Sequence, residues 1–350
     1  MQHLAFVSVL ALLFTILMRW GFIHLPDEKW QILASVPRHK HSADTWNGIN
    51  FTFYGFFTAF AYTFATAILV ILLESVNIPL SGLSILVISI LGLCVPASKL
   101  IARIVEKKSS TFTVSGASFT GIALTPLVVV AINHFIGSRM GFHLPVIVVM
   151  AGLATAYAFG EGIGRLACIS FGCCYGKRLS ECPPRMQRFM KNLCFVFSGK
   201  TKKIAYAHGL DGQKVIPVQA ITSLIFCASG LVSVYLFLEG YYRSAFLQAV
   251  VVTQTWRYVS ELLRADYRGE GKISVYQILS GISVGLAVIY CGVFPADLIS
   301  AGDIWAGLAA MWDPFVIILL QIIFVSTFIY TGKSQVTASI TMFYVVQNRI

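Results

Sequence analysis

Gly160-Glu161-Gly162-Ile163-Gly164-Arg165-Leu166-Ala167-Cys168, continued by Gly172-Cys173-Cys174-Tyr175-Gly176-Lys177, is the stretch around which this chain is organised. It begins where a long apolar run ends, and it carries an arginine into the membrane boundary. Its alternating glycines remove side chains where another backbone or a ligand comes close. Arg165 is costly at that depth unless it faces a cavity, a partner or an anion, and Glu161 lies one helical turn earlier as a candidate partner. The stretch therefore indicates a charged site, with a snorkelling arginine at a helix end as the alternative.

The composition is that of a polytopic membrane protein. The chain has 350 residues, of which 57% are hydrophobic and 12% charged, whereas a soluble domain carries about 25% charged residues. The formal net charge is +11. In a membrane protein this excess indicates anionic lipid head groups or topology signals before nucleic acid. Nothing in the sequence is typical of a nucleic-acid module, and no cofactor is predicted.

Nine apolar runs are long enough to be candidate spans. They cover residues 3–24, 50–74, 80–102, 121–137, 144–160, 217–238, 244–263, 274–294 and 304–331. The first run lacks a basic start and an obvious cleavage site, so we interpret it as a retained helix rather than a signal peptide. We therefore predict an all-α, polytopic integral membrane protein with about seven to nine transmembrane helices and one small basic polar insertion.

Two polar segments interrupt these runs. Residues 25–49 are expected to be a solvated loop. Residues 177–216 are the basic insertion, where nine Lys or Arg against two acids give a local charge of +7. Polybasic segments gain about 1 kcal/mol per charge near anionic lipid. We therefore favour a position at the head-group level over a solvated loop for the insertion, on the basis of Arg185, Arg188, Phe189, Lys191, Phe195 and Phe197.

A second charged row ends another apolar run. Arg257, Glu261 and Arg264 lie at positions i, i+4 and i+7, which places them on one face of a helix. Three charges at the end of an apolar helix must face protein, water or an anion. The row makes an ordinary snorkelling arginine at position 165 a weaker explanation.

The opening stretch resembles the signature of the prolipoprotein diacylglyceryl transferase family, roughly Gly-Arg-x-Gly-Asn-Phe-x-Asn-Gly-Glu-x-x-Gly-Arg. Gly164, Arg165, Gly172 and Gly176 match it, and Lys177 stands for the final arginine; Cys168 and Cys173 occupy an asparagine and the glutamate position. The charged row of Arg257, Glu261 and Arg264 matches a second motif, Arg-Phe-x-x-Glu-x-x-Arg, completely. The resemblance runs in matching order over about residues 53–294.

Further matches support the resemblance, and two histidines of the family pattern are missing. The matching positions are Tyr54, Gly55, Gly116, Ser118, Phe119, Gly121, Pro217, Gln219 and Gln277. Thr120 and Ile216 stand where the family has histidines, and Thr222 stands where it has a glutamate. The chain is therefore similar to a divergent member.

The resemblance implies a transferase that moves the diacylglyceryl group of phosphatidylglycerol to an acceptor thiol, the cysteine of a lipoprotein signal peptide, in the bacterial cytoplasmic (inner) membrane. Another anionic phospholipid as donor and another acceptor stay open. Arginines bind the phosphate, and Glu261 would hold them in place. On this resemblance the expected catalytic residues are Arg165, Arg257, Glu261 and Tyr54. The residues expected to contact substrate are Arg264, Gly116, Ser118, Thr120, Gly121, Gly164, Cys168, Gly176 and Gln219. The base for the thiol stays open, with Glu161, Tyr54 or a cysteine thiolate as candidates.

The chain divides into three stretches on this interpretation. Residues 1–49 form an extra N-terminal helix and a polar loop, and residues 50–294 form the transferase-like membrane domain with the insertion at 177–216. Residues 295–350 add a C-terminal helix and tail.

The cysteines leave two other functions open. Five of the eight fall between positions 168 and 194, without a Cys-x2-Cys pair, so no metal site is predicted. Cys173 and Cys174 are expected to be structural residues of a glycine-rich turn. The alternatives are a membrane thiol oxidoreductase that uses these two cysteines, and a non-catalytic protein that binds or transports anionic lipid.

Overall fold

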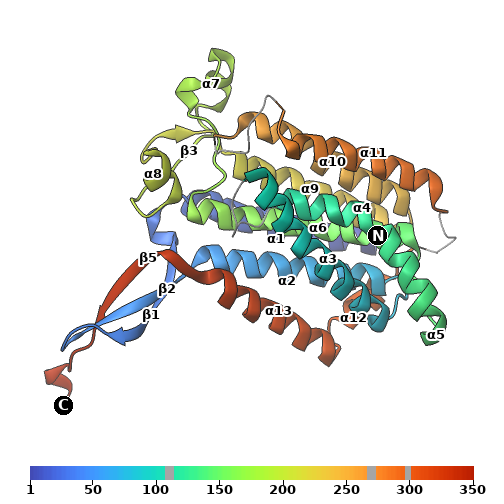
Figure 1. Cartoon of the computed structure of the whole chain (residues 1–350), viewed down its shortest axis with the longest axis horizontal. Helices are drawn as coiled ribbons and strands as arrows, with labels where there is room; N and C mark the ends of the chain where they lie inside the picture. Colours follow the sequence, from blue (N-terminus) through green and yellow to red (C-terminus); the bar gives the residue numbers. More distant parts are fainter. Residues whose placement is uncertain (107–113, 266–272, 296–300) are drawn as a thin grey trace.

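The computed structural model describes residues 1–106, 114–265, 273–295 and 301–350. Most helices run side by side, and the strands gather at one end of the bundle (Figure 1). The α-helices are α1 Gln2–His24, α2 Phe53–Glu74, α3 Leu80–Glu106, α4 Val114–Ile132, α5 Ser138–Met140, α6 Val146–Phe171, α7 Pro184–Met190, α8 Lys203–His208, α9 Val218–Leu238, α10 Tyr242–Leu263, α11 Val275–Val293, α12 Ile304–Ala310 and α13 Pro314–Gly332. The strands are β1 Ile32–Lys40, β2 Thr45–Thr52, β3 Phe195–Val196, β4 Lys214–Val215 and β5 Lys333–Met342.

Eight helices within the described residues are long and apolar enough to cross a membrane. They are α1, α2, α3, α4 with its continuation to Met140, α6, α9, α11 and α13. The remaining expected span, residues 244–263, corresponds to α10. This helix of 22 residues is more polar and packs against α6, α9 and α11. The prediction of an all-α polytopic membrane protein with seven to nine membrane helices is therefore confirmed.

The last expected span is not one helix. The run 304–331 divides into α12 and α13, because Asp313 lies between them and caps the second helix. Its carboxylate accepts a hydrogen bond from the amide of Phe315 at 2.8 Å. Pro314 follows in the first helical position, where its missing N–H is not needed.

Helix α6 lies at the centre of the bundle. Within its most apolar stretch 78% of the residues are buried, compared with 11% in α13. Helices α2, α9 and α10 pack around it. A Cβ atom at Gly162 would lie 2.6 Å from Sγ of Cys227 in α9, and one at Gly160 would lie 3.2 Å from Cβ of Ala65 in α2. The alternating glycines therefore let neighbouring helices close on the signature helix, as small residues do in membranes.

The prediction of a solvated loop at residues 25–49 is wrong in part, because the segment forms β1 and most of β2. β1, β2 and β5 make a three-stranded antiparallel sheet with β2 in the middle (Figure 1). Thr45 pairs with Met342, and Phe51 pairs with Lys333. Thr52 then ends β2 and caps α2, since its hydroxyl oxygen accepts from the amide of Gly55 at 3.3 Å. The sheet joins the start of the chain to its end.

The basic insertion is a small folded unit and not a single interfacial segment. Phe189 in α7 is 72% exposed, as a head-group position requires. Phe195 and Phe197 are buried, however, in a cluster that includes Leu25 and Leu166 of the bundle. The interfacial prediction is therefore wrong for these two aromatic residues, because packing against the end of α6 removes them from any membrane surface.

Candidate active site

Two arginines from different helices share one carboxylate. Arg165 Nη2 donates a hydrogen bond to Oε1 of Glu161, one turn earlier on α6. Arg257 of α10 places its Nη2 3.3 Å from the same oxygen, and its side chain is 7% exposed against 4% for Glu161. An isolated buried charge is expensive, so the shared carboxylate offsets part of the cost of placing two guanidinium groups here. We call Glu161, Arg165 and Arg257 the arginine–glutamate cluster.

Hydroxyl groups of α4 and α6 hold Arg257 in position. Its Nη1 donates to the hydroxyl of Ser115 at the start of α4. Its Nη2 donates to the hydroxyl of Tyr157, in α6, at 2.6 Å. The flat guanidinium group is thus fixed by α4, α6 and α10 together, which orients its remaining N–H donors.

The arginine–glutamate cluster is suited to bind an anion. Its two guanidinium groups and one carboxylate leave one positive charge. Nε of Arg165 and Nε of Arg257 are buried and have no hydrogen-bond partner within the described part of the chain. Buried donors without a partner are rare in proteins. The excess charge and the unused donors favour a phosphate or carboxylate as the missing partner.

The signature turn, residues 172–177, is fastened to both neighbouring segments. Gly176 forms an antiparallel bridge with Arg264, just after α10, and the amide of Lys177 donates to the carbonyl of Leu263 at 2.9 Å. On the other side the amide of Gly176 donates to the carbonyl of Ile216 at 3.2 Å. A Cβ atom at position 176 would lie 2.7 Å from Ile216, so the turn needs glycine there. These bonds place the buried Arg264 beside the turn.

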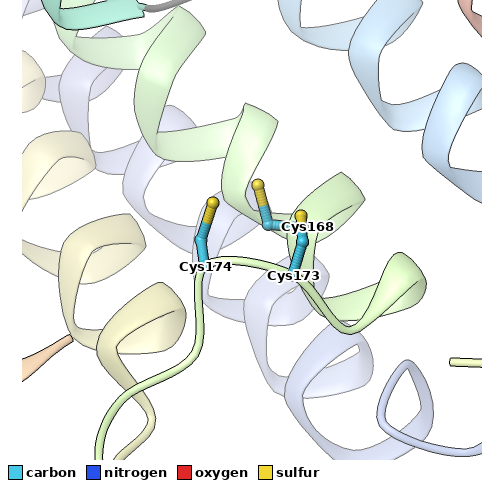
Figure 2. A group of neighbouring side chains, drawn as sticks. All are labelled: Cys168, Cys173 and Cys174. Carbon is cyan, nitrogen blue, oxygen red and sulfur yellow. The ribbon is translucent and has the colours of Figure 1, made fainter. Parts of the chain in front are cut away.

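Three thiols meet at the end of α6. Gly172 ends the helix with φ +72°, a left-handed conformation that favours glycine, and the chain turns back there. The sulfurs of Cys168, Cys173 and Cys174 consequently all lie within 4.8 Å of one another, and Figure 2 shows them directed into one space. Gln219 of α9 supports the turn, since its Nε2 donates to the carbonyl of Cys173 at 2.7 Å. We call these three cysteines the thiol cluster.

Charge is distributed unevenly within the thiol cluster. Hydrogen bonds from the thiols of Cys168 and Cys173 hold the pKa of Cys174 well below its usual value. The positive charges of Arg264 and Arg165 act in the same direction. The cluster therefore lies within the electrostatic field of two of the expected phosphate-binding arginines.

Tyr54 lies beside the thiol cluster. It is in the first turn of α2 and packs edge-on against Phe171, with ring centroids 5.6 Å apart. It also lies within electrostatic range of all three thiols. The structure thus brings together Tyr54, which we predicted as a catalytic residue, and Cys168, which we predicted as a substrate-contacting residue.

The expected substrate-contacting residues of α4 are engaged within their own helix. The hydroxyl of Thr120 donates to the carbonyl of Gly116 at 2.9 Å, and Ser118 donates to the carbonyl of Ser115 at 3.1 Å. Thr120 is buried, and it carries no group that accepts a proton near neutral pH. The α4 residue that reaches the arginine–glutamate cluster is Ser115.

Two expected glycines face neighbouring helices. A Cβ atom at Gly121 would lie 3.6 Å from Sγ of Cys94 in α3, and one at Gly164 would lie 3.9 Å from Cβ of Ala61 in α2. Both are ordinary packing distances. Their contact with a substrate stays a prediction.

Glu261 has a different environment from Glu161. Glu161 is the carboxylate that touches both Arg165 and Arg257. Oε2 of Glu261 is buried and accepts no hydrogen bond from the described residues. That oxygen is therefore available to a proton or to a donor on a ligand.

Sequence reasoning missed Ser115 and Tyr157 as partners of Arg257. Tyr157 carried a signal, because it lies four residues before Glu161 and so on the same face of α6. Ser115 carried only its position next to Gly116 in a matched motif.

Comparison with known proteins identifies a family. The family model described as prolipoprotein diacylglyceryl transferase matches residues 43–293. Neither the curated proteins nor the solved structures contain a match. The matched residues include the arginine–glutamate cluster, the signature turn and α10, and the resemblance expected over residues 53–294 is confirmed. Membership indicates a multi-pass membrane transferase that acts in lipoprotein biosynthesis. The chain belongs to the prolipoprotein diacylglyceryl transferase family.

Proposed function

We propose that this protein transfers the diacylglyceryl group of phosphatidylglycerol to the cysteine thiol of a prolipoprotein signal peptide, in the bacterial cytoplasmic membrane. The observation that carries the proposal is the arginine–glutamate cluster, in which the buried Arg257 and the partly buried Arg165 keep one excess positive charge. The reaction forms a thioether and releases glycerol phosphate, so negative charge grows on the leaving phosphate. Fixed cations stabilise such growing charge most in a site that excludes water.

Each arginine has a defined part in this proposal. Arg257 is held by Ser115, Tyr157 and Glu161, so it needs little rearrangement when the phosphate arrives. Arg165 shares the carboxylate and approaches from α6. Arg264 adds a third cation beside the signature turn. Arginine suits this task because its planar fork binds phosphate oxygens in pairs.

Two observations support a lipid donor. The site lies between helices that are apolar enough to cross a membrane, at the end of the bundle that carries the insertion (Figure 1). α7 on that insertion presents Phe189 and the exposed Arg185 and Arg188, which suit an anionic lipid surface.

Alanine variants of the two arginines test the proposal. The assay measures transfer of labelled diacylglyceryl from phosphatidylglycerol to a lipobox peptide by the purified full-length protein. Arg257→Ala and Arg165→Ala should each lower the rate by about 10²–10³-fold, the usual effect of removing one donor to a developing charge. Arg243→Ala is the matched control, because Arg243 lies at the other end of α10 and donates to the carbonyl of Phe294 at 2.9 Å. Full activity of Arg257→Ala would reject this site.

One observation favours a second candidate, a protein that binds anionic lipid without turning it over. The two positions where the family pattern has histidines hold Thr120 and Ile216, and neither accepts a proton near neutral pH. This candidate predicts that labelled phosphatidylglycerol binds in an Arg257-dependent way while no peptide is labelled.

A further inference from the structure

The two positions where the family pattern has histidines hold no group that could take a proton from the acceptor thiol. An acceptor thiol must lose its proton before it attacks, because the thiolate is the nucleophile. Thr120 bonds to its own helix, and Ile216 is fully buried and apolar. The described residues do contain three thiols close together at the C-terminal end of α6, those of Cys168, Cys173 and Cys174 (Figure 2).

The thiol cluster has the dimensions of a metal site. Thiolates bound to zinc at about 2.3 Å lie about 3.8 Å apart in a tetrahedral arrangement. The three sulfurs all lie within 4.8 Å of one another, so about an ångström of movement suffices to close around one ion. All three cysteines are free, and none is engaged in a disulfide.

The surroundings favour a negatively charged metal–thiolate group. Arg165 and Arg264 both interact electrostatically with Cys174, and they would balance the net charge of three thiolates around a divalent ion. The turn is preformed, because Cys173 donates from its amide to the carbonyl of Cys168 at 3.0 Å and receives support from Gln219 at 2.7 Å. A preformed site avoids much of the ordering that metal binding otherwise requires.

We infer that Cys168, Cys173 and Cys174 bind one thiophilic divalent ion of the Zn²⁺ class and leave its fourth position for the acceptor thiol. Three protein ligands with an open position are the arrangement of catalytic zinc, whereas structural zinc has four. Soft thiolate ligands select such ions over Mg²⁺ or Ca²⁺. This inference rests on the proposed function for the identity of the incoming thiol, but the metal site itself does not depend on it.

The chemical step balances without an external base. The peptide S–H binds at the open position and releases its proton to solvent, because a coordinated thiol is deprotonated. The sulfur then donates an electron pair to the glycerol carbon that carries the phosphate. The bond from that carbon to the phosphate oxygen breaks, and glycerol phosphate leaves with the electron pair. Arg165 and Arg257 receive the charge that develops on the phosphate, beside the thiol cluster.

Metal content is the first test, and it does not depend on activity. The full-length protein, purified with reducing agent, is analysed for Zn²⁺ and then titrated with Co²⁺, whose thiolate charge-transfer absorption reports sulfur ligands. We expect one ion per chain with that absorption. Cys168→Ser, Cys173→Ser and Cys174→Ser should each weaken binding by about tenfold or more. Cys291→Ser is the control, because this cysteine lies near Arg243 at the opposite end of the bundle.

Folding is checked separately, so that a lost site is not confused with a lost protein. Each serine variant must elute as the wild type does and keep its thermal transition. The metal site is rejected if the wild type binds no more Zn²⁺ or Co²⁺ than the triple serine variant. It is also rejected if mass spectrometry finds two of these cysteines joined in a disulfide in protein taken directly from membranes, a result that supports thiol oxidoreductase chemistry.

Activity then tests the role of the open position. Removal of the ion with a chelator should lower transfer to the lipobox peptide by about 10²-fold or more, comparable to the loss of a general base, and Zn²⁺ should restore it. Undiminished transfer by metal-free protein would reject thiol activation. Metal binding without transfer to any peptide would overturn the proposed function and the activation step while confirming the metal site.

Discussion

Arg257 and Lys202 are both buried basic side chains, but the protein stabilises them in opposite ways. Arg257, in the bundle, faces the carboxylate of Glu161 and two hydroxyl groups. Lys202, in the insertion, is 0% exposed, and its Nζ donates to the main-chain carbonyls of Leu25 at 2.8 Å and Ser170 at 2.7 Å. Burial lowers the pKa of Lys202 to about 7, against the attraction of Asp27 and Glu28.

The difference shows where this chain needs a permanent charge. A neutral amine has two N–H donors, which matches the two carbonyls that surround Lys202. Arginine cannot be deprotonated in a protein, so Arg257 must be given a counter-charge instead. A fixed positive charge suits the proposed phosphate site, whereas Lys202 needs only to join the end of α1 and α6 to the insertion. The following changes test this distinction.

Glu161→Gln should have the largest effect on stability. It removes the only negative charge of the arginine–glutamate cluster, while Arg257 stays buried and Arg165 stays partly buried. Breaking a buried pair in this way lowers the free energy of unfolding by about 3–5 kcal/mol. Thermal unfolding of the detergent-solubilised protein measures this, with Glu239→Gln as the control. Glu239 pairs with His3 at 3.1 Å and is 36% exposed, so its loss should change stability by about 1 kcal/mol or less. Equal thermal transition temperatures for both variants would contradict a stabilising role of Glu161 in the arginine–glutamate cluster.

Arg257→Lys should come next, with transfer falling by about 10²–10³-fold although the charge type is kept. A lysine has no planar fork with which to bond Ser115, Tyr157 and Glu161 at once. Burial should also lower its pKa, as it does for Lys202, so residual activity should be higher near pH 6 than near pH 8. Arg178→Lys is the control, because Arg178 is 41% exposed in a surface pair with Glu181. Wild-type rates from Arg257→Lys would show that any cation suffices.

The sequence was sufficient to predict the helices and the charged faces. Apolar runs of membrane length determine α1 to α4, α6, α9 and α11, because a chain in lipid must bond its backbone internally. The spacing of Glu161 and Arg165 predicts a pair within one helical turn, and the structure confirms it. The contact of Arg257 with Glu161 was not predictable in the same way, since it depends on how α10 packs against α6.

Features that depend on chain reversals were also missed. The chain has no Cys-x2-Cys pair, and the left-handed turn at Gly172 is what brings Cys168 close to Cys173 and Cys174. β5 comes from the far end of the chain and pairs with β2. Apolar and polar residues do not alternate strictly enough in either strand to predict this pairing. Lys202 was one of nine basic residues in a polar segment, with no local pattern to separate it from Lys203.

Lys202→Met should have a smaller effect, confined to the insertion. The substitution keeps the length of the side chain but leaves the carbonyls of Leu25 and Ser170 without their donor. Unsatisfied buried acceptors cost about 1–3 kcal/mol each, and the better burial of methionine offsets part of this, so we expect a loss of about 2 kcal/mol. Tryptophan fluorescence should report this loss, because Trp30 packs against the hydrophobic cluster that contains Leu25. Lys203→Met, an exposed neighbour, should be neutral. A neutral Lys202→Met would show that the amine contributes nothing to the fold.

The last expected effect is a dependence of stability on pH, which is the smallest when it is taken per pH unit. The pKa of Lys202 is lowered from 10.5 to about 7 on folding, so between these values the unfolded chain binds more protons than the folded one. Stability from this residue should therefore rise as pH increases from about 7 toward 10, by at most about 1.4 kcal/mol per pH unit, and stay constant below pH 7. Of its neighbours, Glu28 does not titrate in this range, because hydrogen bonds from Thr201 lower the pKa of its carboxyl. The measurement compares the thermal midpoint of wild type and Lys202→Met at several pH values from 6 to about 9. The wild type should gain stability relative to the variant above pH 7, since methionine cannot titrate and all other groups are shared. Parallel curves would mean that Lys202 keeps its proton when buried, and the contrast with Arg257 would then lie in its partners alone.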